Sequence, residues 1–308
     1  MTLRSYVEML RVTDSVYDKP RFREAVDGLV QTYLSVHDDP PSAQLAREEA
    51  QLAKLSKEER QKIRKKQKAQ KERFEKDEKE AADAAEAERQ KLQEQAAKDG
   101  KKPVAKVEKP PDLDPVGDLL LQSETPLDDA LAVLTLMQKH ASNRPKTHND
   151  LFSVYVRQGK VPLALRSLKR ALALDSRNFE TKKSVCELVV AVNSGPGDDK
   201  LLQLVKPQAL ELLGGVTVEQ YAEALVTAAA NATETKFAAR AVFCVFGSGS
   251  KKTKALLAKA VNSISLETAK AKVCRETFET LRAMDADAAV LFKKKCTEKF
   301  PRGGELFQ

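Results

Sequence analysis

Residues 125–140 read T-P-L-D-D-A-L-A-V-L-T-L-M-Q-K-H, and after a polar break residues 150–178 read D-L-F-S-V-Y-V-R-Q-G-K-V-P-L-A-L-R-S-L-K-R-A-L-A-L-D-S-R-N. Three apolar residues of the first segment, Ala130, Leu134 and Met137, recur 34 residues later as Ala164, Leu168 and Ala171. A fixed period of this length indicates a helical repeat, in which each helix pair buries its apolar face only against its neighbours. The two segments therefore predict a stack of α-helical pairs.

The second segment also has the residue chemistry of a tetratricopeptide (TPR) unit. Leu151 and Tyr155 are four residues apart, so they share one face of the first helix. Gly159 occupies the turn, where the absence of a Cβ permits tight backbone geometry. Ser176 stands where the repeat usually has proline, and an ordinary antiparallel helix pair without superhelical stacking is the alternative. We predict an all-α fold, a TPR-like helical-repeat solenoid interrupted by a long charged helix or disordered segment.

The composition of the chain agrees with stacked helices. Of its 308 residues, 32% are charged and 5% are aromatic, and none is Trp. This is little aromatic volume for a single globular core, but it is ordinary for Ala- and Leu-rich helices. No apolar run approaches the roughly 18 residues of a membrane span, and residues 1–10 lack the apolar core of a secretory signal. We expect no membrane association and a cytoplasmic location.

Four parts are expected along the chain. They are a TPR-like helix pair at 1–41, a charged, basic-then-acidic helical arm and linker at 42–111, TPR-like repeats at 112–193 and a C-terminal helical region at 194–308. In the first part, an amphipathic stripe is formed by Phe22, Val26, Leu29 and Tyr33. Ala25 and Leu29 repeat the spacing of Ala130 and Leu134. The apolar residues of 1–12 have no preceding helix to cover them, which leads us to expect further repeats before residue 1.

The arm differs from the rest of the chain in composition. Ala, Glu, Lys and Gln dominate residues 42–99, and these are strong helix formers. Beyond Phe74 no apolar stripe continues, so fraying or disorder is expected there, with a coiled coil as the alternative. Residues 100–111, which read G-K-K-P-V-A-K-V-E-K-P-P, have the composition of a linker.

Helices are predicted to continue through the C-terminal region. One is expected at 179–193, and others near 198–213, 217–231, 235–246, 252–262, 266–283 and 286–299. Turns between them are marked by Gly214-Gly215, Gly247-Ser248-Gly249 and Asp285. No segment has the alternating pattern of a strand, which favours an all-α fold.

The sharpest functional feature is the basic segment 57–73, which holds nine Lys and Arg residues against three Glu. Its cations are Lys57, Arg60, Lys62, Arg64, Lys65, Lys66, Lys68, Lys71 and Arg73. A helix charged on several faces is unsuited to a core, but it suits a phosphate backbone and should bind it more weakly as salt rises. No aromatic residue is interleaved, so recognition of charge and shape is expected. A solvated charged helix and a nuclear-localisation signal are the alternatives.

No candidate catalytic, cofactor-binding or metal site is found. His37, His140 and His148 have no Ser/Asp or Cys arrangement nearby, and we expect them at the surface or at helix ends. The four cysteines, Cys186, Cys244, Cys274 and Cys296, have no zinc-binding spacing, and we expect reduced, packed thiols.

Several segments, in order, carry a resemblance to a known family. They are M-T-L-R-S-Y-V-E-M-L (1–10), K-I-R-K-K-Q-K-A-Q-K (62–71), D-P-V-G-D-L-L-L-Q-S-E-T-P-L-D-D-A-L-A-V-L (114–134), L-R-S-L-K-R-A-L-A-L-D-S-R-N (165–178) and C-T-E-K-F-P (296–301). Together they resemble the C-terminal part of the auxiliary subunit of the N-terminal acetyltransferase A (NatA) complex.

The resemblance implies a non-catalytic scaffold. In the family, a TPR superhelix wraps a separate GNAT-fold catalytic subunit and docks the complex on the ribosome, and the basic segment 57–73 matches the family's lysine-rich segment. The implied partners are that catalytic subunit and, through the basic arm, ribosomal RNA, with no membrane and no small-molecule substrate. The acetyl-CoA motif R/Q-x-x-G-x-G/A is not found on a strand–helix turn, so no cofactor is expected. The family's inositol hexakisphosphate site has no matching motif here. An RNA- or DNA-associated TPR adaptor unrelated to acetylation is the alternative.

Overall fold

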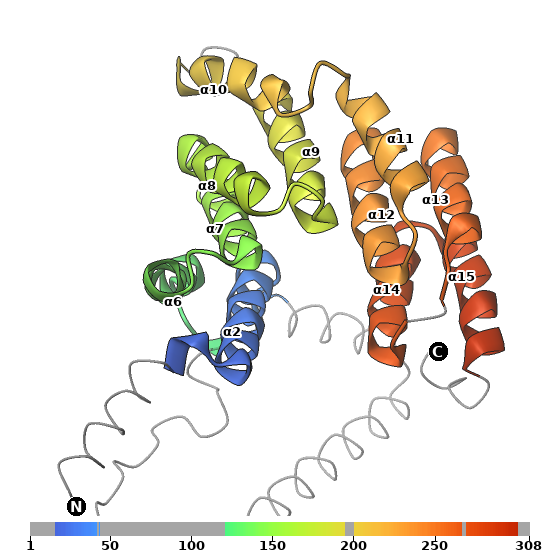
Figure 1. Ribbon diagram of the computed structural model, residues 1–308, viewed down its shortest axis with the longest axis horizontal. Coiled ribbons are helices and arrows are strands. Elements are labelled where there is room, and N and C mark those ends of the chain that lie inside the picture. Colours follow the sequence, from blue (N-terminus) through green and yellow to red (C-terminus); the bar gives the residue numbers. More distant parts are fainter. Residues whose placement is uncertain (1–15, 42, 44–120, 195–199, 267–268, 301–308) are drawn as a thin grey trace, which may run out of the picture. The chain divides into compact units, whose positions relative to one another are not determined.

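The computed structural model describes residues 16–41, 43, 121–194, 200–266 and 269–300, and all regular structure in these ranges is helical (Figure 1). The chain divides into two compact units, Met1–Leu34 with Thr125–Gln308, and Ser35–Glu124. The packing described below is that of the first unit. The predicted arm and linker lie outside the described residues except for residue 43. For the residues that are described, the predicted all-α, TPR-like fold is confirmed.

Eleven α-helices lie in the described ranges, after a short 3-10 helix at Val16–Asp18. The first six are α2 (Pro20–Asp38), α6 (Pro126–His140), α7 (Pro145–Arg157), α8 (Val161–Leu174), α9 (Phe179–Ser194) and α10 (Lys200–Glu211). They are followed by α11 (Val218–Ala228), α12 (Ala232–Phe246), α13 (Lys251–Ser263), α14 (Ala271–Met284) and α15 (Ala286–Lys299). Of the helix pair predicted at 1–41, residues 1–15 lie outside the described residues.

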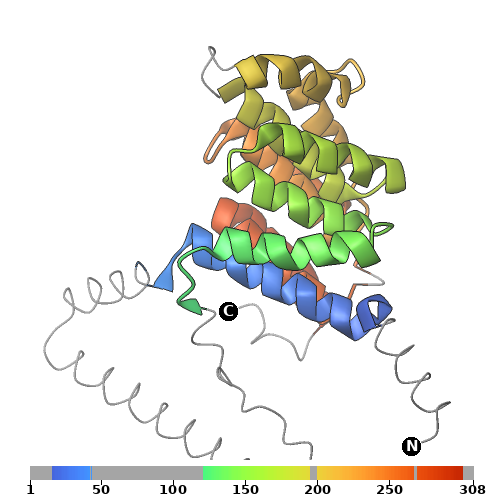
Figure 2. The same ribbon diagram turned by 90° about the vertical axis from the view of Figure 1, so that its left-hand side faces the viewer.

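The residues that repeat at 34-residue spacing form the core of the stack. Each has at most 1% of its surface exposed: Ala130, Leu134, Met137, Ala164, Leu168 and Ala171. Small alanines on facing helices let the backbones approach, while the leucines and Met137 fill the space between them. Successive helices α6 to α9 therefore pack layer upon layer (Figure 2), and each contacts its neighbours along the chain.

The turn between α7 and α8 contains Gly159, with φ at +70°. This left-handed conformation costs any residue with a Cβ about 1–2 kcal/mol, which explains glycine at that position. The turn holds itself together because the Lys160 amide donates to the Tyr155 carbonyl at 2.9 Å. The predicted helix–turn–helix geometry is confirmed here.

In helix α2 the predicted stripe of Phe22, Val26, Leu29 and Tyr33 packs in the core, but the predicted repeat pair Ala25 and Leu29 is displaced. Ala25 is exposed and Leu29 is only half-buried, whereas Val26 and Val30 are 6% and 0% exposed. The buried pair is rotated by one residue relative to the predicted pair. Apolar residues occupy both faces of this helix, and packing against α6 selects the face whose valines and Tyr33 bury more apolar surface than Ala25 would.

The C-terminal helices α11–α15 pack around two apolar clusters. One joins α12 to α15 through Leu257, Phe278, Leu281 and Phe292, and the other joins α9, α11 and α12 through Val226, Ala238 and Val242. Helix α12 begins earlier than predicted, at Ala232, because the Asn231 side chain accepts a hydrogen bond from the Glu234 amide. Helix α14 begins later than predicted, at Ala271. The loop before it is held by the Ser265 amide, which donates to the Ala230 carbonyl at 3.0 Å.

Candidate interaction surfaces

The nine cations of the basic segment 57–73 all lie outside the described residues. They are Lys57, Arg60, Lys62, Arg64, Lys65, Lys66, Lys68, Lys71 and Arg73. Their role in binding a polyanion stays a prediction. Three other features of the described helices bear on function: a polar joint between repeats, the buried thiols, and the grooves between helices.

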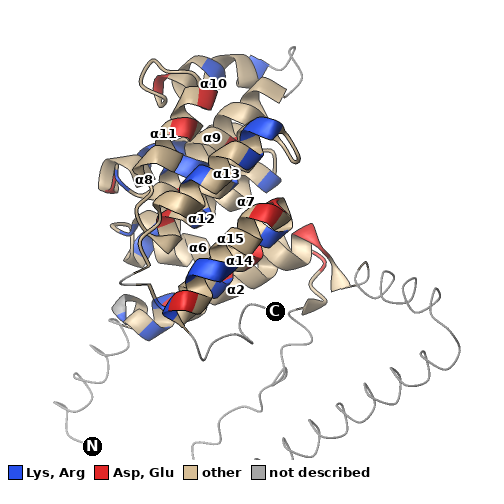
Figure 3. Cartoon of the chain, turned by 90° about the vertical axis from the view of Figure 1, so that its right-hand side faces the viewer, with Lys and Arg blue, Asp and Glu red and all other residues tan. Residues whose placement is uncertain are grey.

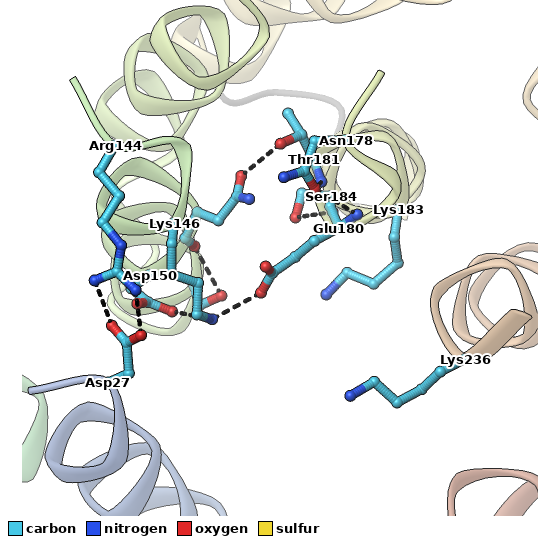
Figure 4. A network of polar contacts seen from close by, with 12 residues as sticks. Asp27, Arg144, Lys146, Asp150, Asn178, Glu180, Thr181, Lys183, Ser184 and Lys236 are labelled. Carbon is cyan, nitrogen blue, oxygen red and sulfur yellow. Dashed lines mark hydrogen bonds and ion pairs between the residues drawn. The ribbon is translucent and has the colours of Figure 1, made fainter. Parts of the chain in front are cut away.

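The polar joint begins where α2 meets the start of α7. The guanidinium of Arg144 donates hydrogen bonds to the carboxylate of Asp27 through both of its terminal nitrogens (Figure 4). One of these nitrogens is 2.9 Å from Asp27 Oδ1. Two parallel hydrogen bonds fix the guanidinium in both distance and orientation. The pair joins residues 117 positions apart in the chain, so it ties the first repeat to the second.

The joint continues at Lys146, whose ammonium lies between two carboxylates. Lys146 Nζ is 2.8 Å from Asp150 Oδ1 on its own helix and 2.8 Å from Glu180 Oε1 on α9. The Asp150 side chain is 3% exposed, and burial raises its pKa to about 6 against the pull of Lys146. Burial also opposes the charge of Lys146, but the two carboxylates outweigh it and raise the pKa of the ammonium. The shared ammonium offsets one of the two carboxylate charges.

Neutral polar groups complete the joint between α7 and α9. The Thr181 hydroxyl donates to Asn149 Oδ1 at 3.1 Å, and both side chains are buried. The Asn178 side chain caps α9 by accepting from the Glu180 amide at 2.9 Å. Asn149 Nδ2 and His148 Nδ1 are buried without a hydrogen-bond partner. The side chains of this joint face each other across the helix contact, an arrangement that positions repeats.

The prediction for the histidines is correct for two and wrong for the third. His37 is exposed near the end of α2, and His140 is the last residue of α6. His148 is 2% exposed, and its Nε2 is 2.8 Å from the Ser142 carbonyl oxygen. It lies in the first turns of α7, where the preceding loop folds back over the helix. Its spacing of three and four residues from the buried Leu151 and Phe152 is the signal that could have placed it inside.

The cysteines pack as predicted. All four are free, and all except the half-buried Cys244 are buried. Burial raises the pKa of Cys186 and of Cys296 to about 12, and that of Cys244 to about 11. Thiols with such pKa values stay protonated at neutral pH, and a protonated thiol is a poor nucleophile.

An apolar groove with a cationic wall runs between α8 and α10. It encloses about 520 Å³. Its lining residues are Pro162, Leu165, Arg166, Lys169, Arg170, Ala173, Leu201, Leu204, Val205 and Gln208. The Lys169 ammonium crosses from one wall to the other and donates to Gln208 Oε1 at 2.7 Å.

A second hollow of about 710 Å³ lies where α9, α12 and α14 begin. Its walls carry Glu180, Glu234 and Asp175 as well as Arg177 and Lys270. The hollow carries both signs of charge, and the Glu234 carboxylate already accepts a hydrogen bond from the Ala230 amide at 2.8 Å. On the side of the molecule that bears α13 and α15, cationic and acidic residues are likewise interspersed (Figure 3). Helix α13 itself carries only lysines as charged residues, and two of them, Lys252 and Lys254, are paired with Glu223 of α11 and Asp287 of α15.

A comparison with protein families gives this architecture its context. The family model described as "N-terminal acetyltransferase A, auxiliary subunit" matches residues 1–171, which is more than half of the chain. The chain belongs to this family. The matched range contains the polar joint's Asp27, Arg144, Lys146 and Asp150, and it also contains the basic segment. The predicted resemblance is confirmed.

Two curated relatives carry the same family name. The N-terminal acetyltransferase A complex auxiliary subunit NAA15 of Arabidopsis thaliana is 39% identical over 194 residues, which are 63% of this chain and 20% of that protein. The N-alpha-acetyltransferase 16, NatA auxiliary subunit, of Mus musculus is 36% identical over 63 residues, which are 20% of this chain and 7% of that protein. The matched part thus spans about a fifth of the length of the plant NatA auxiliary subunit.

Neither a candidate metal site nor a candidate membrane-spanning helix occurs in the described part of this NatA auxiliary family member. Within it, no group of three or more His, Cys, Asp or Glu side chains is placed to bind a metal ion. No helix in the described ranges combines the length and apolarity that crossing a bilayer requires. Sequence reasoning missed the polar joint, although opposite charges at Lys146 and Glu180 lie one repeat period of 34 residues apart. That coincidence of charge and period is the feature that could have revealed it.

Proposed function

We propose that this chain is a non-catalytic auxiliary subunit that holds the GNAT-fold catalytic subunit of a NatA acetyltransferase. It anchors that enzyme on the ribosome in the cytoplasm, so that nascent chains are acetylated as they emerge. The observation that carries the proposal is the family match over residues 1–171. The helical stack supports it, because solenoids of helix pairs offer extended surfaces for binding other proteins.

The residues of the described helices support a scaffold role over an enzymatic one. The buried ionisable groups around Lys146 serve to join α7 to α9. The cysteine thiols have raised pKa values and lie in apolar surroundings. A general base or nucleophile needs a partner group and access to substrate. Neither the groups around Lys146 nor the cysteine thiols combine these two properties.

The basic segment 57–73 is the proposed contact with ribosomal RNA. Nine cations against three acids in this stretch would neutralise several phosphates and release condensed counterions. The division of the chain into a first helix pair (1–41), arm and linker (42–111), repeats (112–193) and C-terminal region (194–308) is part of the same proposal. In it, the helices hold the enzyme and the arm reaches the ribosome.

The first test measures catalytic-subunit binding. The full chain is co-expressed with a tagged GNAT-fold catalytic subunit, and co-purification is followed by acetylation of a nascent-chain peptide. We expect a stable complex, and no acetyl transfer by the full chain alone. If the chain acetylates the peptide without the catalytic subunit, or if no complex forms, the scaffold proposal is wrong.

The second test measures ribosome binding by co-sedimentation. Reversing the charges of Lys62, Arg64, Lys65 and Lys66 to Glu should weaken binding at least about tenfold at low salt and leave the catalytic-subunit complex intact. The matched control reverses four other lysines, Lys206, Lys251, Lys272 and Lys294, which are exposed and make no ion pair among the described residues. Both variants have the same net charge. Equal losses in the two variants would show a nonspecific effect, and loss of RNA binding with no change in acetylation would favour an RNA adaptor.

A further inference from the structure

The groove between α8 and α10 has two chemically distinct walls. The α10 wall presents Leu201 and Leu204, which are 57% and 68% exposed. The floor is formed by Leu165 and Val205, of which only 5% and 4% is exposed. Leu204 is the most exposed large apolar side chain among the described residues. Leaving leucines in water forgoes the free energy of burial, so this wall suits an apolar partner.

The α8 wall is cationic. Arg166, Lys169 and Arg170 line it, and none of the residues lining the groove is Asp or Glu. Lys169 is held by Gln208. Arg166 and Arg170 are exposed and make no ion pair among the described residues. They stand one helical turn apart, so their guanidinium groups are available along the same edge of the groove.

The spacing of the lining residues fits a helical occupant. On α10 the lining positions are 201, 204, 205 and 208, and on α8 they are 162, 165, 166, 169, 170 and 173. Both sets follow the i, i+3, i+4, i+7 pattern of one helix face. A channel between two such faces is the shape into which the ridge of a third helix packs. Apolar anchors at the same spacing are the usual means by which a groove recognises an amphipathic helix.

We propose that the α8–α10 groove docks an amphipathic helix of a partner protein, with leucine-like residues on one face and Asp or Glu beside them. The apolar residues cover Leu201, Leu204 and Val205, and the acids pair with Arg166 and Arg170. Charge complementarity selects an acidic partner, since the groove has three cations and no carboxylate on its lining. A nucleic acid fits less well, because no aromatic side chain lines the groove to stack on bases.

This inference goes beyond the proposed function and is tested separately from it. The probe is a fluorescein-labelled, Leu- and Glu-containing amphipathic helical peptide of about 18 residues, titrated with the full chain and followed by fluorescence anisotropy. A peptide of the same composition in scrambled order is the negative control. We expect the helical peptide to bind saturably and the scrambled peptide not to bind.

Two matched variant pairs test the two walls. Leu204→Gln should weaken binding about tenfold, whereas Leu210→Gln, on the same helix but outside the groove, should change it less than about twofold. Arg166→Glu with Arg170→Glu should also weaken binding about tenfold, and a peptide with Lys in place of Glu should restore it. Lys206→Glu with Lys251→Glu, both exposed and outside the groove, is the charge control.

Three results would overturn the proposal. One is equal binding of the helical peptide to Leu204→Gln and to Leu210→Gln, or no saturable binding. Another is tight binding of a single-stranded RNA that the arginine variant loses and Leu204→Gln keeps, which would assign the groove to nucleic acid. The third is self-association of the chain that Leu204→Gln abolishes, which would assign the groove to a second copy. All substituted residues are exposed, so the variants should fold, and their retention of the catalytic subunit is measured independently.

Discussion

Helices α6–α9 and helices α11–α15 are held together by different interactions. The joint between α7 and α9 places Lys146 between Asp150 and Glu180 and buries the Asn149–Thr181 hydrogen bond. The contacts among α12, α14 and α15 are made mainly by apolar side chains such as Leu281 and Phe292, and the ion pair between α12 and α14, Lys236–Glu276 at 2.9 Å, has an exposed carboxylate. One of the few buried polar contacts there is the Thr277 hydroxyl, which donates to the Ala232 carbonyl at 3.1 Å.

The difference shows two ways of setting how far one helix slides along another. An apolar contact tolerates small shifts, provided that the total volume is kept. An ammonium that must reach two carboxylates at 2.8 Å fixes one alignment of α7 and α9. A buried charge network contributes less to the free energy of unfolding than to the choice of one helix arrangement. Removing one partner is nevertheless destabilising, because it leaves a buried charge without a counter-charge. We infer that the alignment of α7 and α9 depends on charge as well as on apolar packing, while that of α14 and α15 depends on volume.

The largest expected effect comes from breaking the apolar region. Phe292→Ala removes a ring that is 0% exposed and should lower the free energy of unfolding by about 3–5 kcal/mol. Urea unfolding followed by circular dichroism measures it. The neighbouring Leu291, 42% exposed, is the control, and Leu291→Ala should cost less than about 1 kcal/mol. Similar losses for the two variants would contradict the assigned core.

The next effect comes from breaking the polar joint. Lys146→Met keeps much of the side-chain length but leaves Asp150 and Glu180 facing each other without a cation, and should cost about 3 kcal/mol. The same urea experiment applies. Arg275→Met serves as the control, because its pair with Glu279 is 58% and 57% exposed and should contribute less than about 0.5 kcal/mol. If the two substitutions lower the free energy of unfolding by the same small amount, the joint is not a buried network.

A pH titration distinguishes the two regions, because among the described residues only the joint has a buried carboxylate with a raised pKa. Asp150 titrates near pH 6 in the folded state and near 3.9 when unfolded, so between these values the folded state holds the extra proton. Its contribution to stability is present at low pH and is lost as pH rises through 6. The wild type should therefore lose about 2 kcal/mol relative to Asp150→Asn between pH 4 and pH 7. A constant difference, or one of opposite sign, would contradict this assignment.

The smallest effect concerns the turn within one repeat. Gly159 has φ at +70°, and a Cβ added there would meet nothing within 4 Å, so Gly159→Ala should cost only the backbone penalty of about 1 kcal/mol. Gly28 lies inside α2, also with open space around it, and Gly28→Ala should stabilise the chain by up to about 1 kcal/mol. Thermal unfolding of both variants compares their melting temperatures. A change of the same sign in both would refute the assigned roles of the two glycines.

The predictability of the fold differs from that of the sites. The core residues of α6 and α8 and the glycine turn at 159 followed directly from the sequence, because period and turn chemistry are local. The repeat position assigned to Ala25 in α2 was wrong, and the boundaries near Asn231 and Ala271 were displaced, since in each case a cap or a neighbouring helix decided between similar local options. The groove at Leu204 was not foreseen, because it exists only where α8 and α10 come together.

The amino-acid sequence by itself determined that this chain is a stack of α-helices, that it belongs to the NatA auxiliary subunit family, and that its cations are concentrated at 57–73. These properties reside in spacing and composition, which act over one or two helical turns. Only the tertiary structure decided that Lys146 bridges to Glu180, that His148 is buried, and that Leu204 borders a cationic groove. Each of these depends on how one helix is rotated and aligned against another, and that is set by packing between residues far apart in the chain.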